Sequence, residues 1–72
     1  MSVYKVIDLI GTSTTSWEEA ATCAVKEASK TLRDLRVAEV TELDMTIDDS
    51  DPNNPVMTYR AKIKLSFKYE GS

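Results

Sequence analysis

Val56–Tyr69, with the sequence VMTYRAKIKLSFKY, alternates apolar and polar side chains over almost its whole length. The apolar members are Met57, Tyr59, Ala61, Ile63, Leu65, Phe67 and Tyr69. A period of two sends these side chains to one face of a β-strand, whereas a helix would scatter them around its circumference. A strand of this length spans about 45 Å, well beyond the usual five or six residues. We therefore expect neighbouring copies of the chain to bury part of it.

Two further segments toward the N-terminus show regular patterns. Val3–Ile10 is rich in β-branched and aromatic residues and predicts a strand that is largely apolar on both faces. Asp8 is the exception in this strand, and a carboxylate among apolar neighbours needs a partner. An arginine, lysine or backbone contact is the simpler interpretation, and a bound ion is the alternative.

A helix is predicted from Trp17 to Arg33. Ser16 and Glu19 fit the capping box that begins many helices. The apolar stripe recurs at spacings of three and four and contains Trp17, Ala20, Ala21, Ala24, Val25, Ala28, Leu32 and Leu35. Trp17 is expected in the core, and Cys23, which adjoins the stripe, is expected to pack as a small residue because the chain has no histidine to activate it.

A second strand is predicted over residues 36–47. Val37, Leu43, Met45 and Ile47 share one parity, but Ala38 and Val40 share the other. That change indicates a β-bulge near residues 39–41. Residues 48–55, DDSDPNNP, favour a turn that joins this strand to the next as a hairpin.

These elements predict a single α+β domain over residues 1–72, in the order β-α-β-β. The first two strands should run parallel through a crossover, and the last strand fits best between them. The result is a three-stranded antiparallel or mixed sheet packed on one amphipathic helix. The other face of the sheet is left for other subunits to cover.

The composition excludes several ways of stabilising the fold and several classes of function. A chain of 72 residues is near the lower limit for independent folding, and one cysteine without histidine provides neither an internal disulfide nor an ordinary zinc site. Oligomerisation is the remaining route to stability. The net charge of −3 argues against nucleic-acid binding. The sequence has no membrane-spanning run and no signal-peptide pattern, which predicts a soluble, cytoplasmic protein.

We find no catalytic constellation and predict that the chain is not an enzyme. The hydroxyl run at residues 13–16 lacks a neighbouring base and is typical of helix capping. Asp48, Asp49 and Asp51 recur as in a calcium loop, but the glycine and terminal glutamate of the EF-hand pattern are missing. An exposed acidic turn is the favoured interpretation. Lys62, Lys64 and Lys68 are expected to be solvated or to pair with Glu39, Glu42 or Asp44 across the hairpin.

Four segments together resemble the dodecin family. They are VYKVIDLIGTS at residues 3–13, SWEEAA at 16–21, TLRDLRVAEV at 31–40 and YRAKIKLSF at 59–67. The resemblance covers nearly the whole chain. It implies a β-α-β-β subunit that assembles with itself as a hollow sphere of twelve copies.

The resemblance also implies a place for flavin. Many dodecins stack paired flavins between tryptophans at the start of the second strand, and a glutamine on the third strand contacts the ring edge. These positions fall on Val37 and Arg60 in this sequence. A branched aliphatic side chain has no flat π-face for stacking, and Arg60 introduces a bulky cation. Both substitutions argue against flavin binding in the usual manner.

The sequence is more similar to a dodecin branch that binds calcium and lacks flavin. Calcium requires hard oxygen ligands, for which Asp8 is the first candidate and Glu42 and Asp44 are the next. A symmetry axis can gather copies of one carboxylate into a site that no single chain contains. The resemblance thus favours a non-enzymatic binding or storage protein that forms a homododecamer and binds calcium.

Two other functions stay open. The chain can be a flavin-binding dodecin, for storage or sequestration of riboflavin or FMN, in which an altered pocket pairs Arg60 with a phosphate. It can also be a purely structural or interaction module without a ligand.

Overall fold

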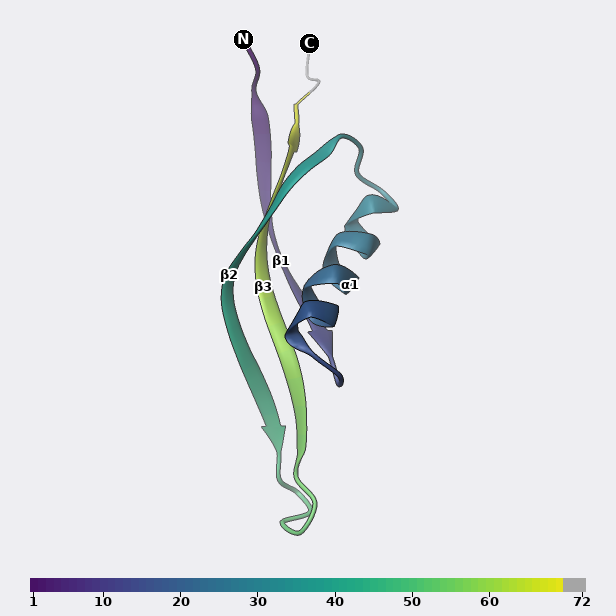
Figure 1. Ribbon diagram of the computed structural model, residues 1–72, viewed down its shortest axis with the longest axis vertical. Coiled ribbons are helices and arrows are strands. Elements are labelled where there is room, and N and C mark those ends of the chain that lie inside the picture. The colour runs from purple at the N-terminus through teal and green to yellow at the C-terminus, as the bar shows by residue number, and fades with distance from the viewer. Residues whose placement is uncertain (70–72) are drawn as a thin grey trace.

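The computed structural model describes residues 1–69, which form a three-stranded sheet with one helix on one face (Figure 1). The elements are β1 (Tyr4–Ser13), α1 (Trp17–Ser29), β2 (Leu35–Asp48) and β3 (Val56–Lys68). The predicted β-α-β-β order and α+β class are confirmed. No helix in this part of the chain is long and apolar enough to cross a membrane.

The strand order is β1-β3-β2, and β3 pairs antiparallel with both neighbours. This confirms the prediction that the last strand lies between the other two. Strand β1 continues past its predicted end at Ile10, because Gly11, Thr12 and Ser13 still pair with β3. Strand β2 gains one residue at each end relative to the prediction, and β3 ends at Lys68 rather than Tyr69.

The predicted β-bulge in β2 is confirmed. Val40 is opposite Ile63, but Glu42 is opposite Lys62, so Thr41 is the extra residue. The Thr41 hydroxyl donates to the carbonyl oxygen of Lys62 at 3.1 Å. Because one residue is inserted, Val40 and the later apolar residues face the same side of the sheet despite their change of parity.

Helix α1 begins as predicted, with the Ser16 hydroxyl accepting the Glu19 N–H at 3.0 Å. Its predicted end at Arg33 is wrong, because the helix ends at Ser29. The N–H groups of Thr31 and Leu32 both donate to the Ala28 carbonyl oxygen, which tightens the last turn. Asp34 then takes a positive φ of 60° and directs the chain into β2.

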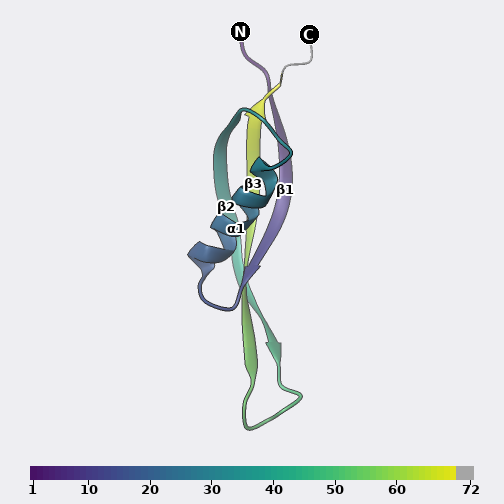
Figure 2. The same cartoon turned by 90° about the vertical axis from the view of Figure 1, so that its right-hand side faces the viewer.

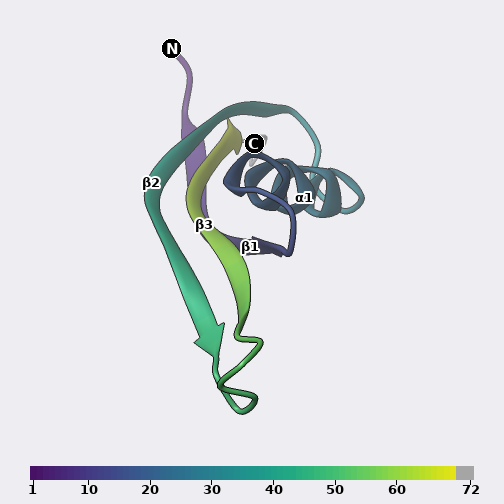
Figure 3. The ribbon, with the colours of Figure 1, turned by 60° about the horizontal axis from the view of Figure 1, so that its bottom comes forward.

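The core lies between α1 and the middle of β3. Ala20, Ala24 and Ala28 face Ala61, Ile63 and Leu65, and all six are buried. The sheet curves around the helix on this side (Figure 3). Gly11 of β1 makes the approach close, since a Cβ at this position would overlap the Ala20 carbonyl oxygen and lie 2.9 Å from the Ala24 Cβ.

The helix covers only part of the sheet. The β2–β3 hairpin extends well beyond the N-terminal end of α1 (Figures 1 and 2). In the described residues of a single chain, the helix-side face of this hairpin leaves large apolar side chains exposed, namely Val40, Leu43, Met45, Ile47 and Met57. The prediction that Cys23 packs beside the apolar stripe is wrong, because three buried alanines complete the contact and Cys23 faces solvent.

Candidate functional site

The face of the sheet that α1 does not cover, here called the outer face, carries an ordered set of charges. Basic residues on β3 stand opposite acidic residues on β2, in the pairs Arg60 with Asp44, Lys62 with Glu42 and Lys64 with Glu39. On the other side of β3, Asp8 of β1 stands opposite Lys64. Directly opposite residues of opposite charge attract one another across a sheet. This part of the outer face is therefore a polar surface in which positive and negative side chains alternate across the strands.

Asp44 and Arg60 make the best-defined contact on this face. The Nε and Nη2 atoms of Arg60 donate to the two carboxylate oxygens of Asp44 at 2.7 and 3.0 Å. Both side chains are partly exposed. A bidentate guanidinium–carboxylate pair fixes the orientation of both groups and is stronger than a single hydrogen bond. The sequence had indicated Asp44 as a lysine partner or metal ligand, and the pair with Arg60 was not predicted.

The same segment of β2 is held from the helix side. The Trp17 Nε1 atom donates to the Asp44 carbonyl oxygen at 3.0 Å, and the Trp17 ring meets Tyr59 edge-on with centroids 4.9 Å apart. Trp17 was predicted to lie in the core, but it is only partly buried and lies at the edge of the core. Its indole N–H needs an acceptor, and the strand carbonyl near the surface supplies one. Asp44 is thus anchored through its backbone on one face and its side chain on the other.

The Asp44–Arg60 pair makes the stability of the fold depend on pH. The hydrogen bonds from Arg60 lower the pKa of the Asp44 carboxyl below its usual 3.8, and the positive charges of Arg60 and Lys62 lower this pKa further. Because the folded-state pKa is depressed, the stabilisation is present above about pH 4 and is lost as the pH falls through the folded-state pKa. We expect wild type to exceed Asp44→Asn in stability at pH 6, and this stability difference to shrink as the pH falls below about 4. Urea unfolding of both proteins across this pH range measures it, and a difference independent of pH would contradict it.

Asp8 is neither buried nor isolated. Its side chain is 61% exposed, and its Oδ1 atom lies 3.5 Å from the Lys64 Nζ atom on β3. The simpler of the two interpretations, a lysine partner, accounts for the carboxylate within one chain. Exposed pairs of this kind contribute at most about 1 kcal/mol, so Lys64 does not prevent Asp8 from accepting another ligand.

The three predicted metal ligands do not come together in one chain. Asp8 lies on one edge strand of the sheet, and Glu42 and Asp44 lie on the other, with β3 between them. No group of three or more His, Cys, Asp or Glu side chains within residues 1–69 is placed to hold a metal ion. Both oxygens of Asp44 already accept from Arg60. An ion site built on these residues therefore requires carboxylates from more than one copy.

The acidic turn between β2 and β3 uses its carboxylates locally. Asp48 accepts the Ser50 N–H and Asp51 accepts the Asn53 N–H, each at 3.1 Å. These are Asx-type contacts, which hold a loop without any ion. The contacts from Ser50 also lower the pKa of Asp48. The geometry agrees with the interpretation of this segment as an exposed turn.

The two positions that the family resemblance assigns to flavin contacts both lie on the outer face. Val37 is 58% exposed and stands opposite Ser66, which in turn stands opposite Val6 of β1. Arg60 lies on β3, well before Ser66 along that strand, and its guanidinium is hydrogen-bonded to Asp44. The predicted pairing of Arg60 with a ligand phosphate would have to displace this carboxylate.

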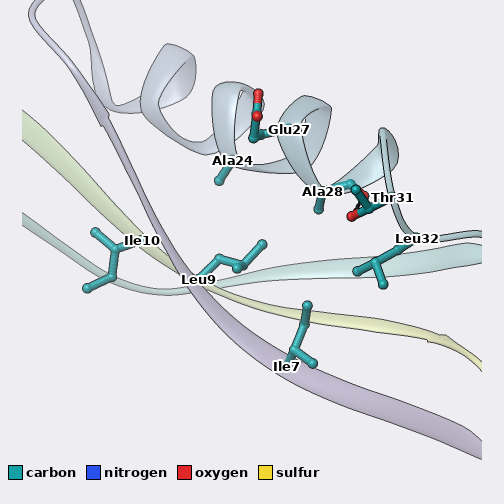
Figure 4. A pocket seen from close by; sticks show the side chains of 8 residues that line it. All are labelled: Ile7, Leu9, Ile10, Ala24, Glu27, Ala28, Thr31 and Leu32. Atoms are coloured by element: carbon teal, nitrogen blue, oxygen red, sulfur yellow. Dashed lines mark hydrogen bonds between the residues drawn. The ribbon is translucent and has the colours of Figure 1, made fainter.

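Two grooves flank the helix on the opposite side of the sheet. The larger has a volume of about 460 Å³ and lies between α1 and β1 (Figure 4). Ile7 and Leu9 extend from β1 toward Ala28 and Leu32, whereas the Glu27 carboxylate is directed away from the strand. The second groove, of about 440 Å³, lies between α1 and β2 and includes Trp17 and Leu43. Both grooves are lined mainly by apolar side chains.

The family model for dodecin matches residues 3–70. The chain belongs to the dodecin family. This confirms the resemblance that the four sequence segments indicated.

Dodecins of known structure are similar along nearly the whole chain. Calcium dodecin from Mycobacterium tuberculosis is 54% identical over 68 residues, covering 94% of this chain and 90% of that protein. Its crystal structure, described as containing a novel calcium-binding site, superposes with a TM-score of 0.83 at 52% identity, covering 99% of this chain and 96% of the other. Dodecin from Thermus thermophilus is 37% identical, covering 94% and 93% of the two chains.

Proposed function

We propose that this dodecin is a cytoplasmic, non-enzymatic binding or storage protein that assembles as a hollow homododecamer and binds calcium rather than flavin. The observation that carries this proposal is the similarity to calcium dodecin, 54% identical over 94% of the chain. The aliphatic side chain of Val37 and the engagement of Arg60 by Asp44 support it, because neither position offers an obvious flavin contact.

The shape of the single chain supports assembly. Its radius of gyration is 15.2 Å, whereas a compact chain of this length has about 11 Å. Its accessible surface is 5484 Å², against about 4,450 Å² for a folded monomer of this mass. Ile63 and Leu65 are the largest side chains fully buried within residues 1–69. A stable protein needs more apolar burial than this, and further copies can provide it.

For the ion site we propose that copies of Asp8 from different subunits provide the first ligands, with Glu42 as a second candidate. Calcium takes six to eight oxygens, so the site must include several carboxylates, carbonyl groups or waters. Asp8 is 61% exposed on β1, and its ion pair with Lys64 is also exposed, so its carboxylate can turn toward a neighbouring copy. Asp44 is the weakest of the three candidates because it would have to give up Arg60.

We expect calcium to raise the melting temperature of the assembled wild-type protein, by about 5 °C or more at millimolar calcium, because a ligand that binds only the folded state stabilises it by mass action. Asp8→Asn keeps the shape of the side chain and should abolish the rise. Asp49→Asn, in the exposed turn, removes the same charge elsewhere and should leave it intact. Differential scanning fluorimetry with calcium measures all three proteins.

Each outcome of this titration is informative. A wild-type protein that shows no shift up to about 10 mM calcium, which is at least about tenfold above the dissociation constants of weak protein calcium sites, argues against the calcium proposal. A rise that survives in Asp8→Asn removes Asp8 from the site, and a rise lost in Asp49→Asn assigns the ion to the turn between β2 and β3.

Flavin binding is the second candidate function. The observation that favours it is an apolar patch on the outer face, where Tyr4, Val6 and Val37 are all about half exposed. Quenching of riboflavin fluorescence tests it directly. Tight quenching by the purified protein would favour flavin over calcium as the ligand.

A further inference from the structure

Arg60 and Lys62 form a pair of cations on the outer face of the sheet. They are two residues apart on β3, so their side chains leave the same face. Thr12 of β1 stands opposite Arg60 and adds a hydroxyl to the same row. A guanidinium beside an ammonium and a hydroxyl is a combination that proteins use to bind phosphate groups.

In this chain, the carboxylate of Asp44 already accepts hydrogen bonds from the Arg60 guanidinium. Asp44 accepts from Nε and Nη2 of Arg60 at 2.7 and 3.0 Å, which is the geometry a bound phosphate would otherwise adopt. Glu42 of β2 stands opposite Lys62 and adds a second negative charge close by. The strand therefore presents cations whose charge is balanced by the neighbouring strand.

We propose that Asp44 is a specificity-determining residue that excludes phosphate-bearing ligands from the outer face by occupying the guanidinium of Arg60. An incoming phosphate would have to displace two charge-assisted hydrogen bonds and then lie beside a carboxylate of its own charge. Removal of the Asp44 charge would convert Arg60, Lys62 and Thr12 into an anion site. This exclusion of phosphate is separate from calcium binding and follows from the geometry of the Asp44–Arg60 pair.

The test is the affinity of the assembled protein for inorganic pyrophosphate, measured by isothermal titration calorimetry at low salt. Asp44→Asn preserves the size of the side chain, and it should bind pyrophosphate at least about tenfold more tightly than wild type, because the ligand no longer has to displace two charge-assisted hydrogen bonds from Arg60. The double variant Asp44→Asn with Arg60→Gln should lose this gain. A gain that persists in the double variant, or no gain in Asp44→Asn, overturns the proposal.

Glu39→Gln is the matched control. It removes one negative charge from the same face of the same strand, but the residue opposite it, Lys64, still pairs with Asp8. Its affinity for pyrophosphate should stay within about threefold of wild type, because only a screened long-range charge changes. A gain equal to that of Asp44→Asn would show that net charge decides the affinity rather than the occupation of Arg60, and would overturn the proposal.

Arg60→Gln alone provides a test that does not require Asp44→Asn to fold or assemble. If Asp44 fully engages the guanidinium, Arg60→Gln and wild type should bind pyrophosphate equally weakly. A clear loss of affinity in Arg60→Gln would show that Arg60 is available to anions in the wild-type protein, and the proposal would be wrong. Light scattering on each variant confirms that proteins of the same assembly state are compared.

Discussion

Replacement of Gly11 by alanine is expected to lower the free energy of unfolding by about 3 kcal/mol, since overpacking of a rigid contact typically costs 1–3 kcal/mol and occasionally more. The added Cβ would overlap the Ala20 carbonyl oxygen and crowd the Ala24 Cβ. Backbone cannot turn aside as a flexible side chain can, so α1 would have to move away from the sheet. The buried side chains beneath it, Ile63 and Leu65, would then lose contacts.

The sign of this effect is itself informative. Gly11 does not have a positive φ, so alanine fits its backbone and would by itself stabilise the chain by about 0.4–1 kcal/mol through the unfolded state. Thr12→Ala, at the next position and exposed, serves as the control and should change stability by less than about 0.5 kcal/mol. Urea unfolding at one fixed protein concentration compares the variants. An equal or raised stability for Gly11→Ala would contradict the close contact between β1 and α1.

A lysine in place of Leu43 is expected to break the assembly. In a single chain Leu43 is 52% exposed, and a substitution at such a surface position normally changes stability by no more than about 0.5 kcal/mol. If neighbouring copies cover this face, the same lysine places an unpaired charge in an apolar contact and costs several times as much. Multi-angle light scattering should give wild type a mass near twelve times 8.0 kDa and Leu43→Lys a much smaller one.

Asn53→Lys is the matched variant for this experiment. It adds the same charge to the same hairpin, but at the exposed turn, and should leave the mass unchanged. A monomeric wild-type protein that is stably folded at micromolar concentration would refute the proposed assembly. A Leu43→Lys protein that assembles normally would show that this face of β2 lies outside the contacts between copies.

The sheet could be predicted from the sequence because its signals are local and repeat along the chain. The alternation in Val56–Tyr69 identified the central strand, and the change of parity after Val40 identified the bulge. The end of the helix was missed for a physical reason. Leu32 continues the apolar spacing of the helix, but it lines the groove beside β1 from a non-helical segment that leads to the positive φ of Asp34.

The charge pair on the outer face was missed because it depends on register. Without the bulge, the pairing of Val40 with Ile63 would continue along the hairpin and place Leu43 opposite Arg60. The extra residue instead brings Asp44 there. The parity change in β2 contains this information, since a one-residue bulge shifts every later pairing of β2 with β3 by one position. The proposed ion ligands Asp8 and Glu42 could not be brought together within one chain, because they lie on opposite edge strands.

The extra residue Thr41 thus determines which face of the sheet each side chain of β2 occupies between the bulge and the hairpin turn. If the chain were one residue shorter at this point, Leu43, Met45 and Ile47 would change sides with Glu42 and Asp44. The exposed apolar surface and the charged surface of the hairpin would then exchange faces, although the composition and length of the chain would hardly differ. For relatives of this protein, the chain length between the helix and the hairpin turn is consequently as informative about what they bind as the identity of any side chain in that interval.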